Sequence, residues 1–303
     1  MSSLSDEIMA LKKEKNAVLL VHNYQRPEIQ DVADFLGDSL GLSIQASKTS
    51  ADVIVFCGVD FMAESAKILS PGKIVIHPEP DARCPMAAMI DAEGLRMMKK
   101  EYPDAVVVGY VNTSAEVKTE LDYCCTSANA VRVVKSLKEK KIIFVPDTNL
   151  GLYVKRFTPD KEIVLWPGFC PTHQNITKDD LLALKVLHPD AEIIVHPECT
   201  PDVIDIADHV ASTEGMVKRV VESAKREFIM GTEKDMCYRL KKENPGKEFY
   251  ATGKALCPNM KKITIEKVVA SLRTLQPRVE LSKETIEKAS LPLKRMMEAG
   301  RGN

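Results

Sequence analysis

Three apolar stretches of similar pattern decide the fold: NAVLLVH (residues 16–22), DAVVVGY (residues 104–110) and DAEIIVH (residues 190–196). They begin 88 and 86 residues apart. Each has the length and composition of a buried β-strand that ends in a polar ring side chain. Self-similarity at a fixed period is the signature of repeated structural units, so this repeat is considered before any local feature.

Three more features recur with the same spacing in every unit. A serine opens a helical stretch, a second strand ends near an acidic residue, and a third strand leads to a Cys-Pro dipeptide. The serines are Ser39, Ser127 and Ser212; the acidic residues are Asp60, Asp147 and Glu233; the cysteines are Cys84, Cys170 and Cys257. Features that keep one order through three periods indicate a triplicated chain.

The order of elements in each unit reads β–α–β–α–β, which is typical of a small parallel sheet flanked by helices. We therefore predict an α/β fold of three pseudo-threefold-related domains with the active site at the central axis. The expected units are residues 1–100, 101–187 and 188–276, and the C-terminal helix within 277–303 joins the first unit.

Three further helices follow from local signals. Helices are expected after two of the cysteine loops, at residues 91–102 and 264–275. A C-terminal helix is expected to begin with Ser282 as its N-cap and to be kinked or shortened at Pro292, because proline lacks the N–H that an interior helical position requires.

Composition excludes several classes of protein. The 42 lysines and arginines nearly balance the 43 aspartates and glutamates, so we predict no nucleic-acid partner. No run approaches the roughly 20 apolar residues of a transmembrane helix, and residues 1–16 do not resemble a signal peptide, so no membrane partner is expected. We predict a cytoplasmic protein whose eight cysteines stay reduced.

The repeat predicts a metal site. In open parallel αβ units the functional groups gather at the carboxyl ends of strands. Three such units around one axis bring Cys84, Cys170 and Cys257 to one centre. Three thiolates suit zinc or an iron–sulfur cluster, but structural zinc prefers four ligands with short-range pairs. The ligand set favours a [4Fe–4S] cluster with one open iron over catalytic zinc, without excluding the latter.

Titratable residues lie beside the predicted centre. The repeated strands end at His22, Tyr110 and His196, and Glu198 follows two residues after the last of these. The three serines are expected to cap helices, and helix N-termini also bind carboxylates and phosphates. Three histidines without equivalents in the other units are expected on the surface or in loops: His77, His188 and His209.

Several short motifs resemble the quinolinate synthase family along essentially the whole chain. They are HNYQ (22–25), GDS (37–39), GVDFMAE (58–64), YVN (110–112), CTSAN (125–129), HPEC (196–199) and NMK (259–261). Two departures are visible: the chain has no C-terminal C-x-x-C element, and Thr172 stands where the family more often has a small apolar residue.

The resemblance implies a transferase that condenses iminoaspartate with dihydroxyacetone phosphate. Phosphate and water leave, and quinolinate forms for NAD biosynthesis. An iminoaspartate-producing enzyme is the expected upstream partner. The implied ligands of a [4Fe–4S] cluster are Cys84, Cys170 and Cys257. The positions matching catalytic or substrate-contacting residues are His22, Tyr24, Tyr110, Asn112, His196 and Glu198. Those matching carboxylate-binding residues are Ser39, Ser127, Ser212 and Thr213, and His173 lies in a family motif and is expected at the substrate.

The chemistry suggests individual roles. Enolisation, imine formation and loss of water require groups that move protons near neutral pH or a positioned phenol. We expect Glu198 to act as a general base with His196 assisting, and Tyr24 to exchange a proton with substrate. Tyr110 and Asn112 would orient the intermediate. The alternatives are another [4Fe–4S] hydro-lyase and a non-catalytic metal- or redox-sensing protein.

Overall fold

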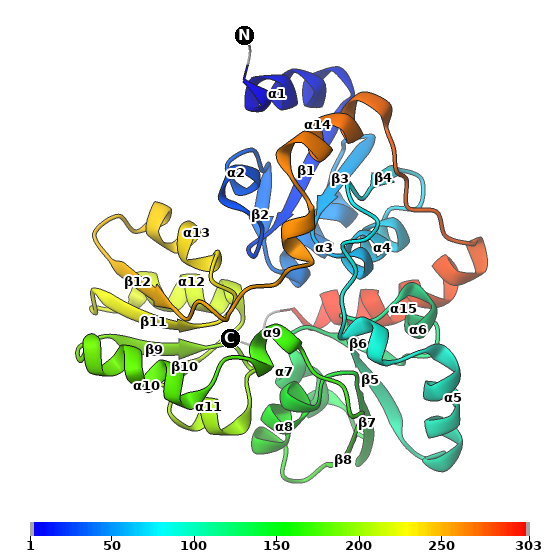
Figure 1. The fold of residues 1–303 in the computed structure, drawn as a ribbon. Coiled ribbons are helices and arrows are strands. Elements are labelled where there is room, and N and C mark those ends of the chain that lie inside the picture. Colours follow the sequence, from blue (N-terminus) through cyan, green and yellow to red (C-terminus); the bar gives the residue numbers. More distant parts are fainter. Residues whose placement is uncertain (1–2, 301–303) are drawn as a thin grey trace.

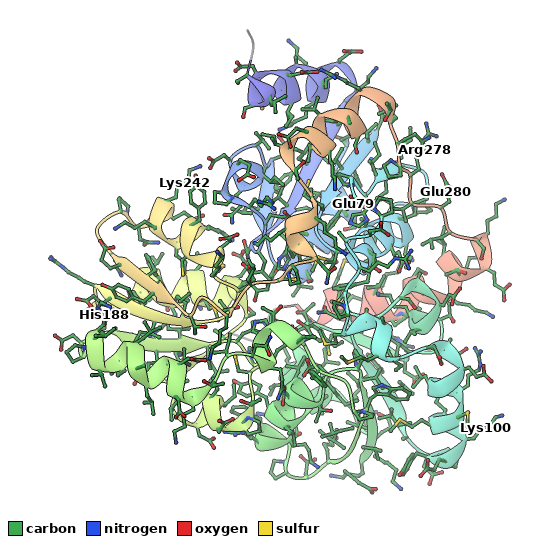
Figure 2. All side chains as sticks on the ribbon, in the orientation of Figure 1. Glu79, Lys100, His188, Lys242, Arg278 and Glu280 are labelled. Carbon is green, nitrogen blue, oxygen red and sulfur yellow. The ribbon has the colours of Figure 1, made fainter. Side chains whose placement is uncertain are left out.

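A computed structural model describes residues 3–300 as three lobes around a common centre (Figure 1). Each lobe contains a four-stranded sheet in which every paired strand runs parallel. The predicted α/β class with three sheet-containing units is confirmed. Charged side chains such as Lys100, Lys242 and Glu280 lie on the periphery of the lobes (Figure 2). No helix within the described range combines the length and apolar character needed to cross a bilayer.

The first unit contains a sheet with strand order β2-β1-β3-β4. Its central strand is buried along nearly its whole length because Val18 to His22 face helices on both sides. The elements are α1 (Leu4–Glu14), β1 (Ala17–His22), α2 (Pro27–Gln30), β2 (Phe35–Gly37), α3 (Ser39–Lys48), β3 (Val53–Cys57), α4 (Asp60–Leu69) and β4 (Ile74–Ile76).

The second unit repeats this arrangement with strand order β6-β5-β7-β8. A short 3-10 helix, η1 (Ala87–Met89), follows the first cysteine loop. The elements are then α5 (Ala92–Glu101), β5 (Val106–Tyr110), α6 (Ala115–Lys118), β6 (Tyr123–Cys125), α7 (Ala130–Ser136), β7 (Lys141–Val145), α8 (Thr148–Phe157) and β8 (Glu162–Leu165).

The third unit has strand order β10-β9-β11-β12. It comprises α9 (Pro171–Gln174), α10 (Lys178–Leu187), β9 (Glu192–Val195), α11 (Pro201–Asp205), β10 (His209–Val210), α12 (Thr213–Glu222), β11 (Glu227–Gly231), α13 (Met236–Glu243) and β12 (Glu248–Ala251). The chain ends with η2 (Met260–Lys262), α14 (Ile265–Thr274) and α15 (Lys283–Ala299).

One short strand per unit, β2, β6 and β10, was not predicted, because two or three residues carry no readable periodicity. An aspartate before each of these strands fixes it to the central strand. The backbone N–H groups of Leu19, Val107 and Ile193 each donate to such an aspartate at 2.8 Å, and the acceptors are Asp34, Asp122 and Asp208. The triplication therefore extends to individual hydrogen bonds.

The helix after each cysteine loop packs against the next unit. Leu95 of α5 lies in the apolar core of the second sheet, Leu181 of α10 lies in that of the third, and Leu272 of α14 returns to that of the first. This cyclic exchange links the three units into a ring. Residues 1–100, 101–187 and 188–276 stay our proposal for the units, with these helices shared between neighbours.

Helix α15 lies between the first two units, where it packs against α4, α6 and β6 (Figure 1). Its N-cap is Ser282, as predicted, and the Ser282 hydroxyl accepts from the backbone N–H of Thr285 at 3.0 Å. Of the two effects predicted for Pro292, a kink or a shorter helix, shortening does not occur, because α15 continues through this buried proline to Ala299. Apolar packing of Leu293 and Met296 on both neighbouring units holds the last turns in place.

His77 lies in the loop after β4, in agreement with the expectation that it is a surface or loop residue. Its side chain is nevertheless buried, and its Nε2 lies 3.1 Å from the carbonyl oxygen of Gly58. The helices predicted after the cysteine loops are confirmed as α5 and α14. Asp91 and Thr264 cap them by accepting from Gly94 and Lys267.

Candidate active site at the centre of the three units

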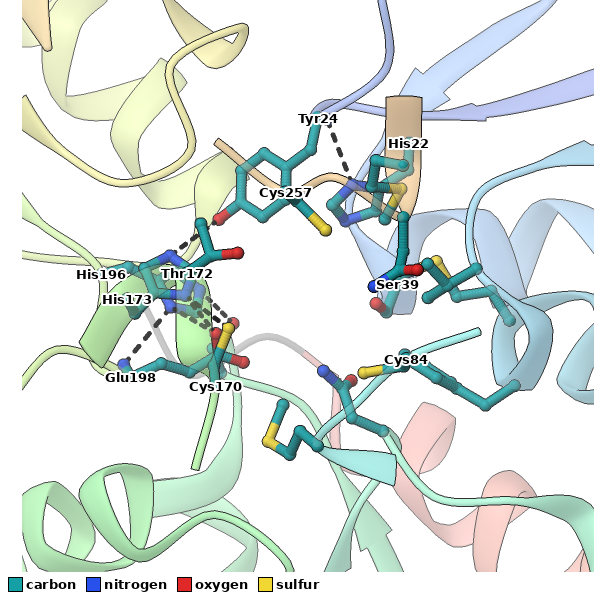
Figure 3. Close-up of a pocket in the computed structure, with 18 of the residues that line it drawn as sticks. His22, Tyr24, Ser39, Cys84, Cys170, Thr172, His173, His196, Glu198 and Cys257 are labelled. Carbon is teal, nitrogen blue, oxygen red and sulfur yellow. Dashed lines mark hydrogen bonds and ion pairs between the residues drawn. The ribbon is translucent and has the colours of Figure 1, made fainter. Parts of the chain in front are cut away.

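A central pocket is lined by loops from all three units (Figure 3). Thirteen of the fourteen residues expected at the site line it: His22, Tyr24, Ser39, Cys84, Tyr110, Asn112, Ser127, Cys170, His173, His196, Glu198, Thr213 and Cys257. The remaining residue, Ser212, is fully buried behind the pocket, where it caps α12.

The three cysteines face a common space from different sides (Figure 3). Cys84 follows β4, Cys170 is the N-cap of α9, and Cys257 precedes η2. Burial raises the pKa of all three thiols above the ordinary value. A backbone N–H group opposes this shift at each sulfur by favouring the thiolate, and in every unit it belongs to the residue three positions later: Ala87, His173 and Met260.

His22 and His196 occupy equivalent strand ends and have the same hydrogen bond. The backbone N–H two residues later, from Tyr24 or Glu198, donates to Nδ1 at 3.2 and 3.3 Å. This contact leaves the proton of each neutral ring on Nε2. Burial lowers the pKa of His22 to about 4 and that of His196 to about 3, so both rings are neutral at pH 7.

Nε2 of His196 lies 3.1 Å from the hydroxyl oxygen of Ser127 and donates to it. This hydrogen bond connects Ser127 of the second unit to His196 of the third. The ring of His196 also stacks on that of His173, with centroids 4.6 Å apart. These contacts fix the plane in which His196 presents its proton.

The Glu198 carboxylate interacts with three other side chains of the pocket. Its carboxylate lies 2.6 Å from Nδ1 of His173 and 3.6 Å from Nδ1 of His196, and the Tyr110 phenol donates to it. Burial opposes ionisation, but the two imidazoles and the phenol lower the pKa of Glu198 to about 2. Burial and the Glu198 charge raise the pKa of Tyr110 well above its ordinary value, so this phenol stays protonated.

A chain of hydrogen bonds joins Tyr24 to Glu198. The Tyr24 phenol lies 2.6 Å from the Thr232 hydroxyl, which lies 3.1 Å from Nε2 of His173. Nδ1 of His173 faces the Glu198 carboxylate at 2.6 Å. The Thr232 hydroxyl therefore links the Tyr24 phenol to the pair formed by His173 and Glu198.

Asn112 supplies an unsatisfied group. Its side chain is buried against the pocket, and its Oδ1 has no hydrogen-bond partner within residues 3–300. A buried acceptor without a partner costs free energy, which a donor on a bound molecule would recover. Asn112 is therefore suited to hold a hydroxyl or imine N–H of a ligand.

The three serines differ in their local roles. Only Ser212 caps a helix, by accepting from the Gly215 N–H at 3.2 Å. Asp38 caps α3, so Ser39 is the first helical residue, and the capping position of α7 is Asn129 rather than Ser127. The capping expectation was thus wrong for Ser39 and Ser127, whose side chains line the pocket instead.

Thr232 was missed by the sequence reasoning. It follows β11 directly and is fully buried, and its neighbours in the pocket come from distant parts of the chain. The equivalent positions in the other units carry Gly58 or Val59 and Pro146, so the repeat offered no polar signal at this point.

Comparisons with known proteins agree with this site. A family model described as "Quinolinate synthetase A protein" matches residues 6–298. The quinolinate synthase of Thermodesulfovibrio yellowstonii is 53% identical over 96% of this chain and 97% of its own length. Those of Geobacter sp. (strain M21) and Methanoregula boonei are 53% and 54% identical, each over 97% of both chains. This chain belongs to the quinolinate synthase family.

Proposed function

We propose that this chain forms quinolinate by condensing iminoaspartate with dihydroxyacetone phosphate, with release of phosphate and water, as a step of NAD biosynthesis. The observation that carries the proposal is the convergence of three cysteines, three imidazoles and two phenols from separate units on one pocket. A non-catalytic metal site would not need proton-transferring groups around its ligands.

We further propose that Cys84, Cys170 and Cys257 hold a [4Fe–4S] cluster. Three thiolates that line one pocket from separate units are the ligand type that an iron–sulfur cluster takes. Tetrahedral zinc with Zn–S bonds of about 2.3 Å places its thiolates roughly 3.8 Å apart. Among the described residues, donor atoms of Cys170, His173 and Glu198 gather within 4.8 Å of one another, whereas the three cysteine sulfurs do not form such a group and so are not placed to bind one zinc ion together.

The Cys170, His173 and Glu198 group is a less suitable metal site. His173 and Glu198 already bond to each other at 2.6 Å, and a single ion at this position would leave Cys84 and Cys257 without a role. When bound, a cluster with three cysteine ligands supplies an open iron that acts as a Lewis acid toward hydroxyl and carboxylate groups.

Substrate anions would bind at the helix starts. The ten-residue helices α3 and α12 begin at the pocket with Ser39 and Thr213, and helix N-termini favour carboxylates and phosphates. The Asn23 side chain donates to the Thr213 hydroxyl at 2.8 Å, so the hydroxyl proton is free to point at a bound anion. Ser127 and Asn112 would complete the binding surface, and Ser212 would support it from behind.

Proton transfer would use the groups already connected in the site. Neutral His22 and His196 each present an Nε2–H, and Tyr24 presents a phenol whose pKa burial raises well above its ordinary value. In the ligand-free site Glu198 is a weak base. Two substrate carboxylates and a phosphate would raise its pKa through repulsion, which brings it closer to the range of an effective general base.

The test is an anaerobic assay of the full chain with both substrates. Brown protein that contains iron and sulfide and forms quinolinate supports the proposal. The same protein without quinolinate would favour another hydro-lyase. Because iminoaspartate hydrolyses readily as an imine, we also propose a cytoplasmic location beside an enzyme that produces it.

A further inference from the structure

The first and third cysteine loops are held by the same pair of hydrogen bonds, and the second loop keeps one bond of the two. In the first unit, the backbone N–H of Asp60 donates to the carbonyl of Ala82 at 3.0 Å. The Asp60 carboxylate accepts from the backbone N–H of Cys84 at 3.0 Å. The two hydrogen bonds fix the loop at the cysteine and at the residue two positions before it.

The third unit repeats the pair, whereas the second keeps only its backbone bond. The Thr148 N–H donates to the Gly168 carbonyl at 2.8 Å, but Asp147 accepts from the Leu150 N–H through one oxygen, and its other oxygen has no hydrogen-bond partner within residues 3–300. The Lys234 N–H donates to the Ala255 carbonyl at 2.7 Å, and Glu233 accepts from the N–H of Cys257 at 3.3 Å. In every unit the carbonyl belongs to the residue two positions before the cysteine. We call this pair of bonds the loop clamp.

The loop clamp leaves the cysteine side chain free and determines where it points. Its acid occupies the amide N–H of the cysteine, and the amide three residues later turns back to the sulfur. The cysteine is thus fixed on both sides before any ligand binds. Groups that orient metal ligands in this way strongly influence how tightly the metal is held.

We propose that Asp60 and Glu233 are positioning residues that preform the cysteine site for the cluster. The inference rests on the proposed cluster, but it concerns residues that do not touch it. The acids act through the backbone of the loops, so the expected effect of losing one is a misdirected sulfur and faster loss of iron.

Asp60 offers the cleanest test. Glu233 also pairs with Lys261 at 3.0 Å, so changing it removes a second interaction. The Asp60 side chain is not the N-cap of α4, which begins after Val59. Glu64, one turn further along α4, is a half-buried acid that accepts from Ala115 rather than from a cysteine loop, and so serves as the matched control.

The experiment compares wild type, Asp60→Ala, Asp60→Asn and Glu64→Gln, each reconstituted anaerobically with iron and sulfide as the full chain. Iron and sulfide per chain and the rate of iron loss to a chelator are measured. Asp60→Ala should lose iron about 10- to 100-fold faster than wild type. Asp60→Asn keeps an accepting oxygen and should stay close to wild type, as should Glu64→Gln.

Equal rates for wild type and Asp60→Ala would overturn the inference, as would equally fast loss from Asp60→Asn or Glu64→Gln. If wild type itself binds no iron and sulfide, the proposed cluster fails instead. If Asp60→Ala does not fold, hydrogen exchange of the cluster-free wild type tests the loop clamp instead. The Cys84 and Cys257 amides should be protected, and rapid exchange at them would refute the loop clamp.

Discussion

The phenolic oxygen of Tyr24 lies 2.6 Å from the hydroxyl oxygen of Thr232, although 208 residues separate them in sequence. The Thr232 hydroxyl oxygen also lies 3.1 Å from Nε2 of His173, and Nδ1 of that ring lies 2.6 Å from the Glu198 carboxylate. The first unit thereby delivers its phenol to a chain of polar groups that ends at Glu198.

Thr232→Val removes this hydroxyl while keeping the shape of the side chain. If Tyr24 exchanges a proton with substrate, we expect kcat to fall by roughly 10²-fold, the usual size of a proton-transfer contribution. KM and iron content should change little, because Thr232 touches neither the anion sites nor the cysteines. Thr232→Ser should restore most of kcat. A variant that loses iron or raises KM alone would contradict this role.

Glu198→Gln removes the charge to which His173 and His196 are held, at 2.6 and 3.6 Å. The amide is a weaker acceptor and no base, so quinolinate formation should fall by at least about 10²-fold. Iron and sulfide per chain should stay at the wild-type level. Glu227→Gln, at a more exposed glutamate 3.3 Å from His188, is the control and should retain full turnover. Retained turnover in Glu198→Gln would exclude this residue from the mechanism.

The buried imidazoles predict a loss of stability in mild acid. Burial lowers the pKa of His22 to about 4 and of His196 to about 3, whereas both titrate near 6.5 in the unfolded chain. Below pH 6.5 the unfolded state therefore binds more protons at these histidines than the folded state does. The free energy of unfolding should fall by about 2 kcal/mol for each histidine between pH 6.5 and 5.

Urea unfolding of the cluster-free chain at several pH values measures this slope. His77, whose pKa is also lowered by burial, adds to it in the same direction. The His196→Asn variant should show a shallower slope than wild type over pH 6.5 to 5. Buried carboxyls whose pKa burial raises, such as Asp147 and Glu233, act in the opposite direction in both chains and cancel in this comparison. An unchanged slope would contradict the neutral, buried state of His196.

The period of about 86 residues was enough to predict the three units and the meeting of the cysteines, because equivalent loops around one axis must converge. What the repeat could not reveal were contacts that break its symmetry. Thr232 has no polar equivalent in the other units, and the buried His77 has no equivalent histidine. The packing of α5, α10 and α14 on the neighbouring unit could not be predicted for another reason. An amphipathic pattern shows that one face of a helix is buried, but not which sheet it packs against.

Gly168 shows how the second unit departs from its neighbours. The equivalent residues in the first and third units are Ala82 and Ala255, but a Cβ on Gly168 would lie 2.4 Å from the carbonyl oxygen of Pro146. The backbone there cannot yield without moving the Gly168 carbonyl, which accepts from Thr148. Gly168→Ala should therefore destabilise the cluster-free chain by about 1–3 kcal/mol.

The same change should also speed the loss of iron, because the displaced carbonyl accepts the backbone bond that holds the Cys170 loop. Gly72→Ala is the control for adding a methyl group, since a Cβ at that position meets no heavy atom within 4 Å. It should leave both the unfolding midpoint in urea and the rate of iron loss close to wild type. If Gly168→Ala unfolds at the wild-type urea concentration, the loop before Cys170 is adaptable. The tight approach of Pro146 would then not be what holds that cysteine in place.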